Sequence, residues 1–244
     1  MTQTGGRGRA GTIALVGGAE FTPPCARLDR WLLGAAVSPA VTVVPTAAKR
    51  HPDMAAATAR RHFESLGGAV QEAMIRTRDD ALDPAWRERL AAAPIIYLAG
   101  GEPPYLASVL EGTPAWDGIR DALAGGAVLA GSSAGAMVLC DTMLRPGSTA
   151  TEPGLGLLAD LVVLPHFSRW RSSLEDVAAV LAPRAGPGGG LGVLGIDECT
   201  GVVLQGDGCR VLGPGTATRY RMDGGRLVTT WILGDGESLR EGCR

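Results

Sequence analysis

The sequence is poor in the features that mark membrane, nucleic-acid-binding and metal-binding proteins. No apolar run reaches the roughly 18 residues that a membrane-spanning helix needs. The formal net charge is −2, and Lys and Arg are scattered rather than clustered, which argues against a nucleic-acid partner. Three histidines and five cysteines without a C-x-x-C pair give no zinc pattern. We therefore expect no membrane span, no nucleic-acid partner, no metal and no cofactor.

Cysteine is also too scarce and too irregular to indicate a disulfide framework. The five cysteines are an odd number, and their spacing follows no repeat. Free thiols in a reducing compartment are the simplest reading, so we expect a cytoplasmic protein. The cysteines are Cys25, Cys140, Cys199, Cys209 and Cys243.

The composition fits a globular protein with one large domain. Hydrophobic residues make up 45% of the 244 residues and charged residues 20%. Residues 1–11 are polar and Gly-rich and lack the apolar core of a signal peptide, so we expect a flexible leader there. Residues 12–244 are long enough to form a single domain with a substantial core.

Short apolar runs alternate with helical stretches in the first part of the chain. This alternation is typical of βαβ units, so it predicts a mostly parallel sheet flanked by helices. Strands are predicted for residues 12–16, 41–44, 69–75, 95–98 and 127–130, and helices for residues 26–33, 53–66, 84–92, 102–110 and 116–123.

Short strands dominate the last quarter of the chain. They follow one another closely and are separated by Gly-rich turns at residues 206–208 and 223–225, which is typical of antiparallel hairpins. Residues 186–190 read as a Pro/Gly-rich loop. The predicted strands are 162–164, 193–196, 201–204, 209–212, 218–222 and 227–232, with a helix over 172–181.

A sharp turn at Ser133 carries the strongest chemical signal. Ser133 is the serine of a Gly-x-Ser-x-Gly sequence, preceded by the predicted strand 127–130 and followed by the helix-prone residues 134–139. Strand, turn and helix together form the nucleophile elbow of serine hydrolases. Its glycines, Gly131 and Gly135, leave room for a strained serine backbone. The alternative is a βα turn that only packs or binds a phosphate.

His166 is the candidate general base. Histidine usually activates a serine nucleophile, and the chain has three. His166 follows the predicted strand 162–164 near its carboxyl end, where open α/β sheets place their sites. His51 precedes a proline and His62 lies in the charged helix 53–66, so both are predicted to lie at the surface.

Asp197 and Glu198 are the candidate acids that would orient the histidine. Both follow the predicted strand 193–196. Because side chains alternate along a strand, at most one of the two should face His166. The spacing does not choose between them.

Five short motifs occur in an order that is more specific than any one of them. Together they resemble the dipeptidase E and cyanophycinase family of serine peptidases, over roughly residues 12–205. The resemblance implies the α/β fold of class I glutamine amidotransferases, with a flavodoxin-like core. The motifs are Gly17-Gly18-Ala19-Glu20, Ala99-Gly100-Gly101-Glu102, Gly131-Ser132-Ser133-Ala134-Gly135-Ala136, Pro165-His166-Phe167-Ser168 and Gly195-Ile196-Asp197-Glu198.

The resemblance also assigns roles to individual residues. It implies Ser133 as nucleophile, His166 as base and Glu198 as acid. It further implies an oxyanion hole made by the backbone N–H groups of Gly101 and Ala134. The expected activity is hydrolysis of peptide bonds, and the expected partners are a peptide substrate and, in a homodimer, a second copy of the chain.

Two departures from the family pattern concern substrate recognition. Where family members commonly carry Asn or Asp and then a polar residue, this chain has residues 102–104, Glu-Pro-Pro. Cyanophycinases carry Asp-Gln before the histidine, whereas this chain has Leu164-Pro165, closer to the dipeptidase pattern. We therefore expect activity on short peptides, with an acidic N-terminal residue, rather than on cyanophycin.

Glu102, Arg169 and Arg171 are the candidate substrate-binding residues. A guanidinium suits an acidic side chain of the substrate, although a solvated basic stretch is the alternative for the two arginines.

Three functions other than peptide hydrolysis remain at this point. An α/β-hydrolase esterase would need a histidine after its acid, and no histidine follows His166. An amidotransferase would need cysteine in place of Ser133. A non-catalytic relative could bind a small molecule or a partner in the same cleft.

Overall fold

The computed structural model describes residues 11–145, 147–185 and 190–243. Residues 1–10 of the predicted leader and residues 186–189 of the predicted Pro/Gly-rich loop lie outside the described residues. The division into a leader and one domain therefore stays a prediction.

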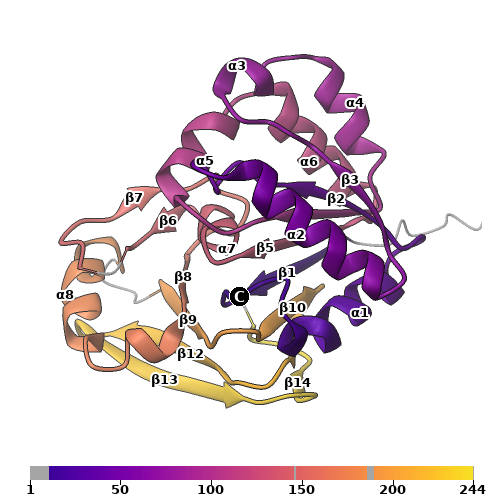
Figure 1. Cartoon of the computed structure of the whole chain (residues 1–244). Helices are drawn as coiled ribbons and strands as arrows, with labels where there is room; N and C mark the ends of the chain where they lie inside the picture. The colour runs from indigo at the N-terminus through magenta and orange to yellow at the C-terminus, as the bar shows by residue number, and fades with distance from the viewer. Residues whose placement is uncertain (1–10, 146, 186–189, 244) are drawn as a thin grey trace, which may run out of the picture.

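The larger of the two main sheets has eight strands, in the order β14-β11-β10-β1-β5-β4-β2-β3 (Figure 1). Five neighbouring strands run parallel, and the three at the other edge are antiparallel, as the sequence predicts. The parallel strands are β1 (Thr12–Val16), β5 (Val128–Ser132), β4 (Ile95–Leu98), β2 (Ala40–Val44) and β3 (Ala69–Glu72); the antiparallel ones are β10 (Gly201–Gln205), β11 (Gly208–Leu212) and β14 (Ser238–Leu239).

Helices cover both faces of this sheet because both faces of its strands are apolar. Ile13 and Leu15 belong to one core cluster, whereas Ala14 and Val16 belong to another on the opposite face. This period of two is the geometry of a strand buried on both sides. One face packs against α1 (Ala26–Ala35) and α2 (Pro52–Ser65). The other lies under α3 (Arg78–Ala81), α4 (Ala85–Ala91), α5 (Pro103–Leu110), α6 (Pro114–Ala124) and α7 (Ala134–Val138).

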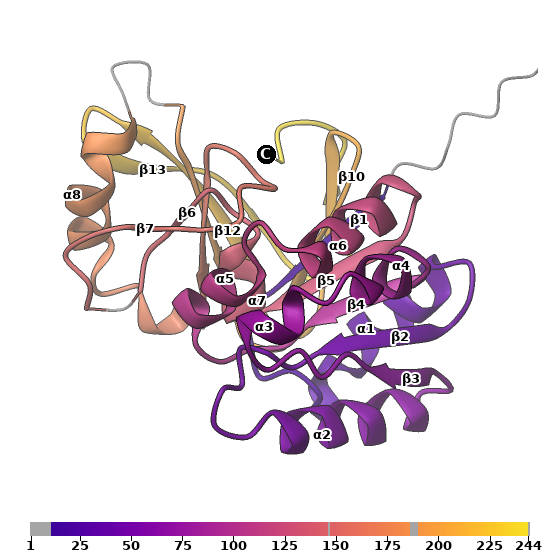
Figure 2. The same ribbon diagram turned by 90° about the horizontal axis from the view of Figure 1, so that it is seen from above.

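A second sheet of four strands lies beside the first, which the sequence did not predict (Figure 2). Leu161 and Val163 join the core of the larger sheet, while Val162 and Leu164 pack toward α8. The second sheet therefore has a buried face on each side. Its order is β13 (Arg226–Leu233), β12 (Ala217–Asp223), β9 (Gly192–Ile196) and β8 (Leu161–Pro165), with α8 (Leu174–Ala185) on its outer face and the short hairpin β6 (Thr142–Met143) and β7 (Glu152–Pro153) nearby.

The turn Gly17-Gly18 joins the two sheets at the point where the site forms. The carbonyl of Gly17 accepts from the N–H of His166 at 2.7 Å, and that of Gly18 accepts from the N–H of Cys199 at 2.9 Å. A Cβ on Gly18 would lie 2.3 Å from Cε1 of His166, and one on Gly17 would lie 2.1 Å from the carbonyl oxygen of Asp197. Glycine is therefore required at both positions for the two sheets to approach.

The expectation of free thiols is wrong for two of the five cysteines. Cys209 and Cys243 form a disulfide that ties β11 to the C-terminal segment, with 5.7 Å between their Cα atoms. Cys25, Cys140 and Cys199 are free and buried. This pair could not be predicted from the sequence, because a single bridge between residues 34 apart leaves no spacing pattern.

Candidate active site

Ser133 lies on a strained turn between β5 and α7. Its backbone has φ 48° and ψ −109°, a conformation that L-residues rarely adopt and that costs about 1–3 kcal/mol. Its N–H donates to the carbonyl of Val16 at 2.9 Å, which fixes the turn against β1. A Cβ on Gly131 would lie 2.4 Å from the carbonyl oxygen of Gly135, and one on Gly135 would lie 2.3 Å from the carbonyl oxygen of Leu98, so both glycines are needed for the elbow to close.

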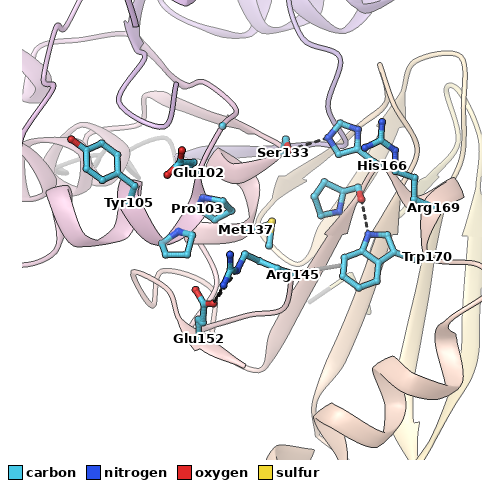
Figure 3. A pocket seen from close by; sticks show the side chains of 13 residues that line it. Glu102, Pro103, Tyr105, Ser133, Met137, Arg145, Glu152, His166, Arg169 and Trp170 are labelled. Carbon is cyan, nitrogen blue, oxygen red and sulfur yellow. Dashed lines mark hydrogen bonds and ion pairs between the residues drawn. The ribbon is translucent and has the colours of Figure 1, made fainter. Parts of the chain in front are cut away.

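The structure brings Ser133, His166 and Glu198 together in one row. Oγ of Ser133 lies 3.0 Å from Nε2 of His166 (Figure 3), and Nδ1 of His166 lies 2.7 Å from Oε1 of Glu198. Nδ1 faces a carboxylate and so carries the ring proton, which leaves Nε2 to accept from the serine hydroxyl. The three residues follow β5, β8 and β9, so each sheet contributes to the row.

Asp197 points away from this row. Its Oδ2 accepts from the N–H of Thr216 at 3.1 Å and from the hydroxyl of Thr216 at 2.9 Å. Nη2 of Arg171 approaches the same oxygen at 3.3 Å. Asp197 and Glu198 thus lie on opposite sides of the chain, as strand alternation predicts, and Glu198 is the one that faces His166.

The two backbone amides predicted to form an oxyanion hole lie in the turns after the neighbouring strands β4 and β5. The N–H of Gly101 lies between two amides with internal acceptors: Gly100 donates to Glu20 at 2.7 Å and Glu102 donates to the carbonyl of Ala47 at 2.8 Å. Within the part of the chain that the structure describes, the N–H groups of Gly101 and Ala134 have no acceptor. Both predicted donors are therefore free to bind a ligand oxygen.

Backbone strain is concentrated around the site. Six non-glycine residues in the described ranges have a positive φ, and five of them lie in the turns after β1, β5, β8 and β9. Such residues persist only where the surroundings hold them, and they gather at functional sites. The five are Ala19, Phe21, Ser133, His166 and Cys199.

Ser133 and His166 open into a pocket of about 620 Å³, a size typical of ligand sites (Figure 3). Its walls are partly apolar, with charged groups around them. The other lining residues are Gly101, Glu102, Pro103, Pro104, Tyr105, Met137, Arg145, Glu152, Pro165, Arg169 and Trp170.

The three candidate substrate-binding residues do not all reach this pocket. Glu102 and Arg169 line it, and the guanidinium of Arg169 lies 3.7 Å from Glu198. Arg171 is not among the lining residues; it contacts Asp197 and lies 5.6 Å from the ring centroid of Phe167.

Sequence reasoning missed one charged pair of the pocket. Nε and Nη2 of Arg145 both donate to Oε1 of Glu152, at 2.9 and 2.6 Å. The pair belongs to the β6–β7 hairpin, whose two-residue strands are too short to show a period in the sequence. No sequence signal could have placed it near Ser133.

No metal site is present in the described residues: none of their His, Cys, Asp and Glu side chains gather in a group of three or more that could hold an ion. None of the described helices is both long and apolar enough to cross a membrane.

Comparison with known proteins agrees with the fold. The model of peptidase family S51 matches residues 13–212. The cyanophycinase of Trichormus variabilis is 33% identical over 220 residues, covering 84% of this chain and 72% of that protein. The cyanophycinase of Synechococcus elongatus is 30% identical over 231 residues, covering 86% and 68%.

A solved structure with the same architecture is that of a peptidase from an acI-B1 actinobacterium. It has a TM-score of 0.79 and 30% identity, covering 95% of this chain and 97% of that one. The family match does not favour the non-catalytic alternative or the esterase alternative. The chain belongs to peptidase family S51 and is a serine-type peptidase.

Proposed function

We propose that Ser133, His166 and Glu198 are the catalytic triad with which this peptidase cleaves short peptides. The observation that carries the proposal is the row of two hydrogen bonds, 3.0 Å from Ser133 to His166 and 2.7 Å from His166 to Glu198, at the edge of a pocket. A serine next to a base that is oriented by a carboxylate is the arrangement that makes a hydroxyl nucleophilic.

The geometry supports a two-step acyl transfer. His166 takes the proton of Ser133 through Nε2 as Oγ attacks the scissile carbonyl carbon. The imidazolium then gives this proton to the leaving amine, and an acyl-enzyme remains on Ser133. A water molecule, deprotonated by His166, attacks the acyl carbon and releases the acid. Glu198 accepts from Nδ1 throughout, which holds the ring in place and stabilises its positive charge.

The free amides of Gly101 and Ala134 are proposed to bind the oxygen that becomes negative in each step. They come from the turns after β4 and β5, which are neighbours in the sheet. The amide of Ala134 is also the first of α7. Removing one such donor from an oxyanion hole typically costs a factor of about 10²–10³ in kcat.

The charges near the site favour a peptide with an acidic group. Arg169 lines the pocket with a side chain that is 69% exposed and therefore available to a substrate. A second hollow of about 460 Å³ adjoins the first through Gly101 and Glu102 and is lined by Lys49 and Arg50, which have no ion-pair partner in the described part of the chain. A carboxylate of the substrate could pair with a cation in either hollow.

Cyanophycin, the substrate that the names of the relatives suggest, is the second candidate. The sequence identity favours it, but two features of the pocket do not. Pro103 and Pro104 form the first turn of α5, and Pro165 ends β8, so these positions offer no backbone N–H. We therefore propose short peptides with an acidic residue rather than the polymer.

One experiment tests both parts of the proposal. Purified protein is incubated with a panel of dipeptides that includes Asp-X, Ala-X and β-linked aspartyl members, and separately with insoluble cyanophycin, and the products are identified by mass spectrometry. We expect Asp-X cleavage that is lost in Ser133→Ala. Cleavage that persists in this variant would contradict the triad, and rapid clearing of the polymer would contradict the substrate.

A further inference from the structure

Glu20 connects two turns of the site without facing the pocket that holds Ser133. Its Oε1 accepts from the N–H of Gly100 at 2.7 Å, and its Oε2 accepts from the hydroxyl of Ser132 at 2.8 Å. Gly100 immediately precedes Gly101, and Ser132 immediately precedes Ser133. The carboxylate therefore ties the turn that carries one oxyanion amide to the strand that carries the nucleophile.

The chain around Glu20 is built to hold the side chain in this position. Ala19 and Phe21, on either side of it, have φ values of 56° and 61°, which non-glycine residues rarely adopt. The carbonyl of Ala19 accepts from the hydroxyl of Thr22 at 2.7 Å and from the thiol of Cys25 at 3.2 Å, so the strained turn is fixed by side chains. Such strain persists only when the surroundings over-determine it.

The contact also explains why residue 100 is glycine. A Cβ on Gly100 would lie 2.6 Å from Oε1 of Glu20 and 3.3 Å from Cβ of Ser133. Any side chain there would push the carboxylate and the nucleophile apart. Glycine at position 100 thus leaves room for both the Glu20 carboxylate and the Ser133 side chain.

We propose that Glu20 is a positioning residue that fixes the oxyanion hole relative to the nucleophile. The inference rests on the proposed function. The amides of Gly100 and Glu102 are held by Glu20 and by the carbonyl of Ala47. The amide between them belongs to Gly101, which lines the pocket that holds Ser133. The two bonds fix the peptide groups on either side of the one that carries the Gly101 N–H. Without Glu20, the peptide group between Ala99 and Gly100 loses its anchor, the Gly101 amide can rotate, and the oxyanion donor is no longer preorganised.

This role predicts a specific kinetic signature. Glu20 lines the second hollow but not the pocket that holds Ser133, and both of its carboxylate oxygens are already bonded to the protein, so its loss should lower kcat and change KM little. A purely structural role would lower the amount of folded enzyme without changing the kcat of the molecules that remain folded. The active fraction must therefore be measured by titration of the active serine.

The test compares Glu20→Ala, Glu20→Gln and Ser132→Ala with the wild type. For Glu20→Ala we expect a roughly 100-fold loss of kcat per titrated site, the scale of one displaced oxyanion donor, with KM within about threefold. Gln can still accept from Gly100 and donate to Ser132, so Glu20→Gln should recover most of the activity. Ser132→Ala removes one arm of the bridge and should lie between the two.

A peptide aldehyde supplies the second readout, because its adduct with Ser133 places an oxygen in the oxyanion hole. The affinity of the aldehyde should fall in parallel with kcat/KM across the variants, whereas the affinity for aspartate, the product of Asp-X cleavage, should not. A wild-type kcat per site in Glu20→Ala would overturn the inference. If Glu20→Ala does not fold, a wild-type kcat per site in both Ser132→Ala and Glu20→Gln would overturn it. Wild-type protein whose Ser133 reacts with no fluorophosphonate would instead overturn the proposed function, and the inference with it.

Discussion

The molecule contains two histidine–carboxylate pairs with the same hydrogen-bond length and very different surroundings. His166 and Glu198 approach to 2.7 Å, and so do His62 and Asp29. The side chains of His166 and Glu198 are 26% and 46% exposed, whereas those of His62 and Asp29 are 7% and 0% exposed. The first pair lies at the edge of a pocket, and Ser133 is hydrogen-bonded to the ring nitrogen of His166 that does not face Glu198. The prediction that His62 lies at the surface is wrong.

The difference shows that the pair alone does not make a catalytic base. His62 lies among aromatic rings, with its ring centroid 5.5 Å from that of Phe63 and 6.2 Å from that of Phe21. Its side-chain partner in the described residues is Asp29, and no hydroxyl of those residues is hydrogen-bonded to the ring. What sets His166 apart is a nucleophile at its second nitrogen and an open path for a substrate.

The largest expected effect is a loss of kcat, which should distinguish His166 from His62. Ser133→Ala and His166→Ala should each lower kcat by about 10⁵-fold or more, and the double variant by no more than either, because the members of a triad act as a unit. Far-UV circular dichroism should be unchanged in both. Peptide hydrolysis per folded molecule is the measurement, with His51→Ala, an exposed histidine, as the control. Loss of activity in His51→Ala or His62→Ala with His166→Ala still active would reassign the base.

The next effect separates the two neighbouring carboxylates. Glu198→Gln should lower kcat by about 10²–10⁴-fold, because the amide cannot stabilise the imidazolium. Asp197→Asn should change kcat by less than about threefold, since Asp197 bonds Thr216 and lies near Arg171. It should instead lower the free energy of unfolding by about 1–2 kcal/mol. Steady-state kinetics and urea unfolding of both variants give the comparison, and the reverse pattern would transfer the orienting role to Asp197.

Much of the fold could be predicted from local patterns. The parallel strands are short, apolar and separated by helical stretches, so their number and positions follow from the sequence. The second sheet does not, because a strand such as β8 has the same apolar run whichever sheet it joins. What directs it is the fit at Gly17 and Gly18, where the two sheets meet at contacts too close for any side chain. Such tertiary packing cannot be predicted from the periodicity of apolar residues in the sequence.

The candidate site shows the same division. Ser133 and His166 could be predicted because each follows a strand end and carries a chemical signature. The choice between Asp197 and Glu198 came from the family resemblance, since alternation leaves both open. His62 was misplaced because its neighbours, Arg60 and Arg61, give the helix a charged face, while the ring itself turns inward to Asp29.

A third prediction concerns the stability that the buried pair contributes. His62→Ala removes the one hydrogen-bond partner that Asp29 has in the described residues and leaves a buried carboxyl group alone. Removing one member of a buried pair typically costs about 3–5 kcal/mol. We expect a loss of this size in urea unfolding, with kcat per folded molecule unchanged. His51→Ala should change stability by less than about 0.5 kcal/mol. Equal unfolding midpoints for the two variants would show that the buried pair is not a stabilising contact.

The smallest effect is a change in how stability depends on pH. Burial raises the pKa of Asp29 above its ordinary value of 3.8, although the hydrogen bond from His62 opposes this. The folded protein therefore keeps this proton to a higher pH than the unfolded chain does. The contribution of the group to stability is complete below pH 3.8 and is lost as the pH rises through the raised value.

Asp29→Asn has nearly the same shape but does not titrate, so it tests this slope directly. The free energy of unfolding of the wild type, minus that of the variant, should decrease as the pH rises from about 3.8 toward neutrality. Urea unfolding at a series of pH values measures the difference. A matched series on Asp53→Asn, an exposed carboxylate on the same side of the sheet, should show no such trend. A difference that grows with pH would mean that the ion pair with His62, rather than burial, governs the pKa of Asp29.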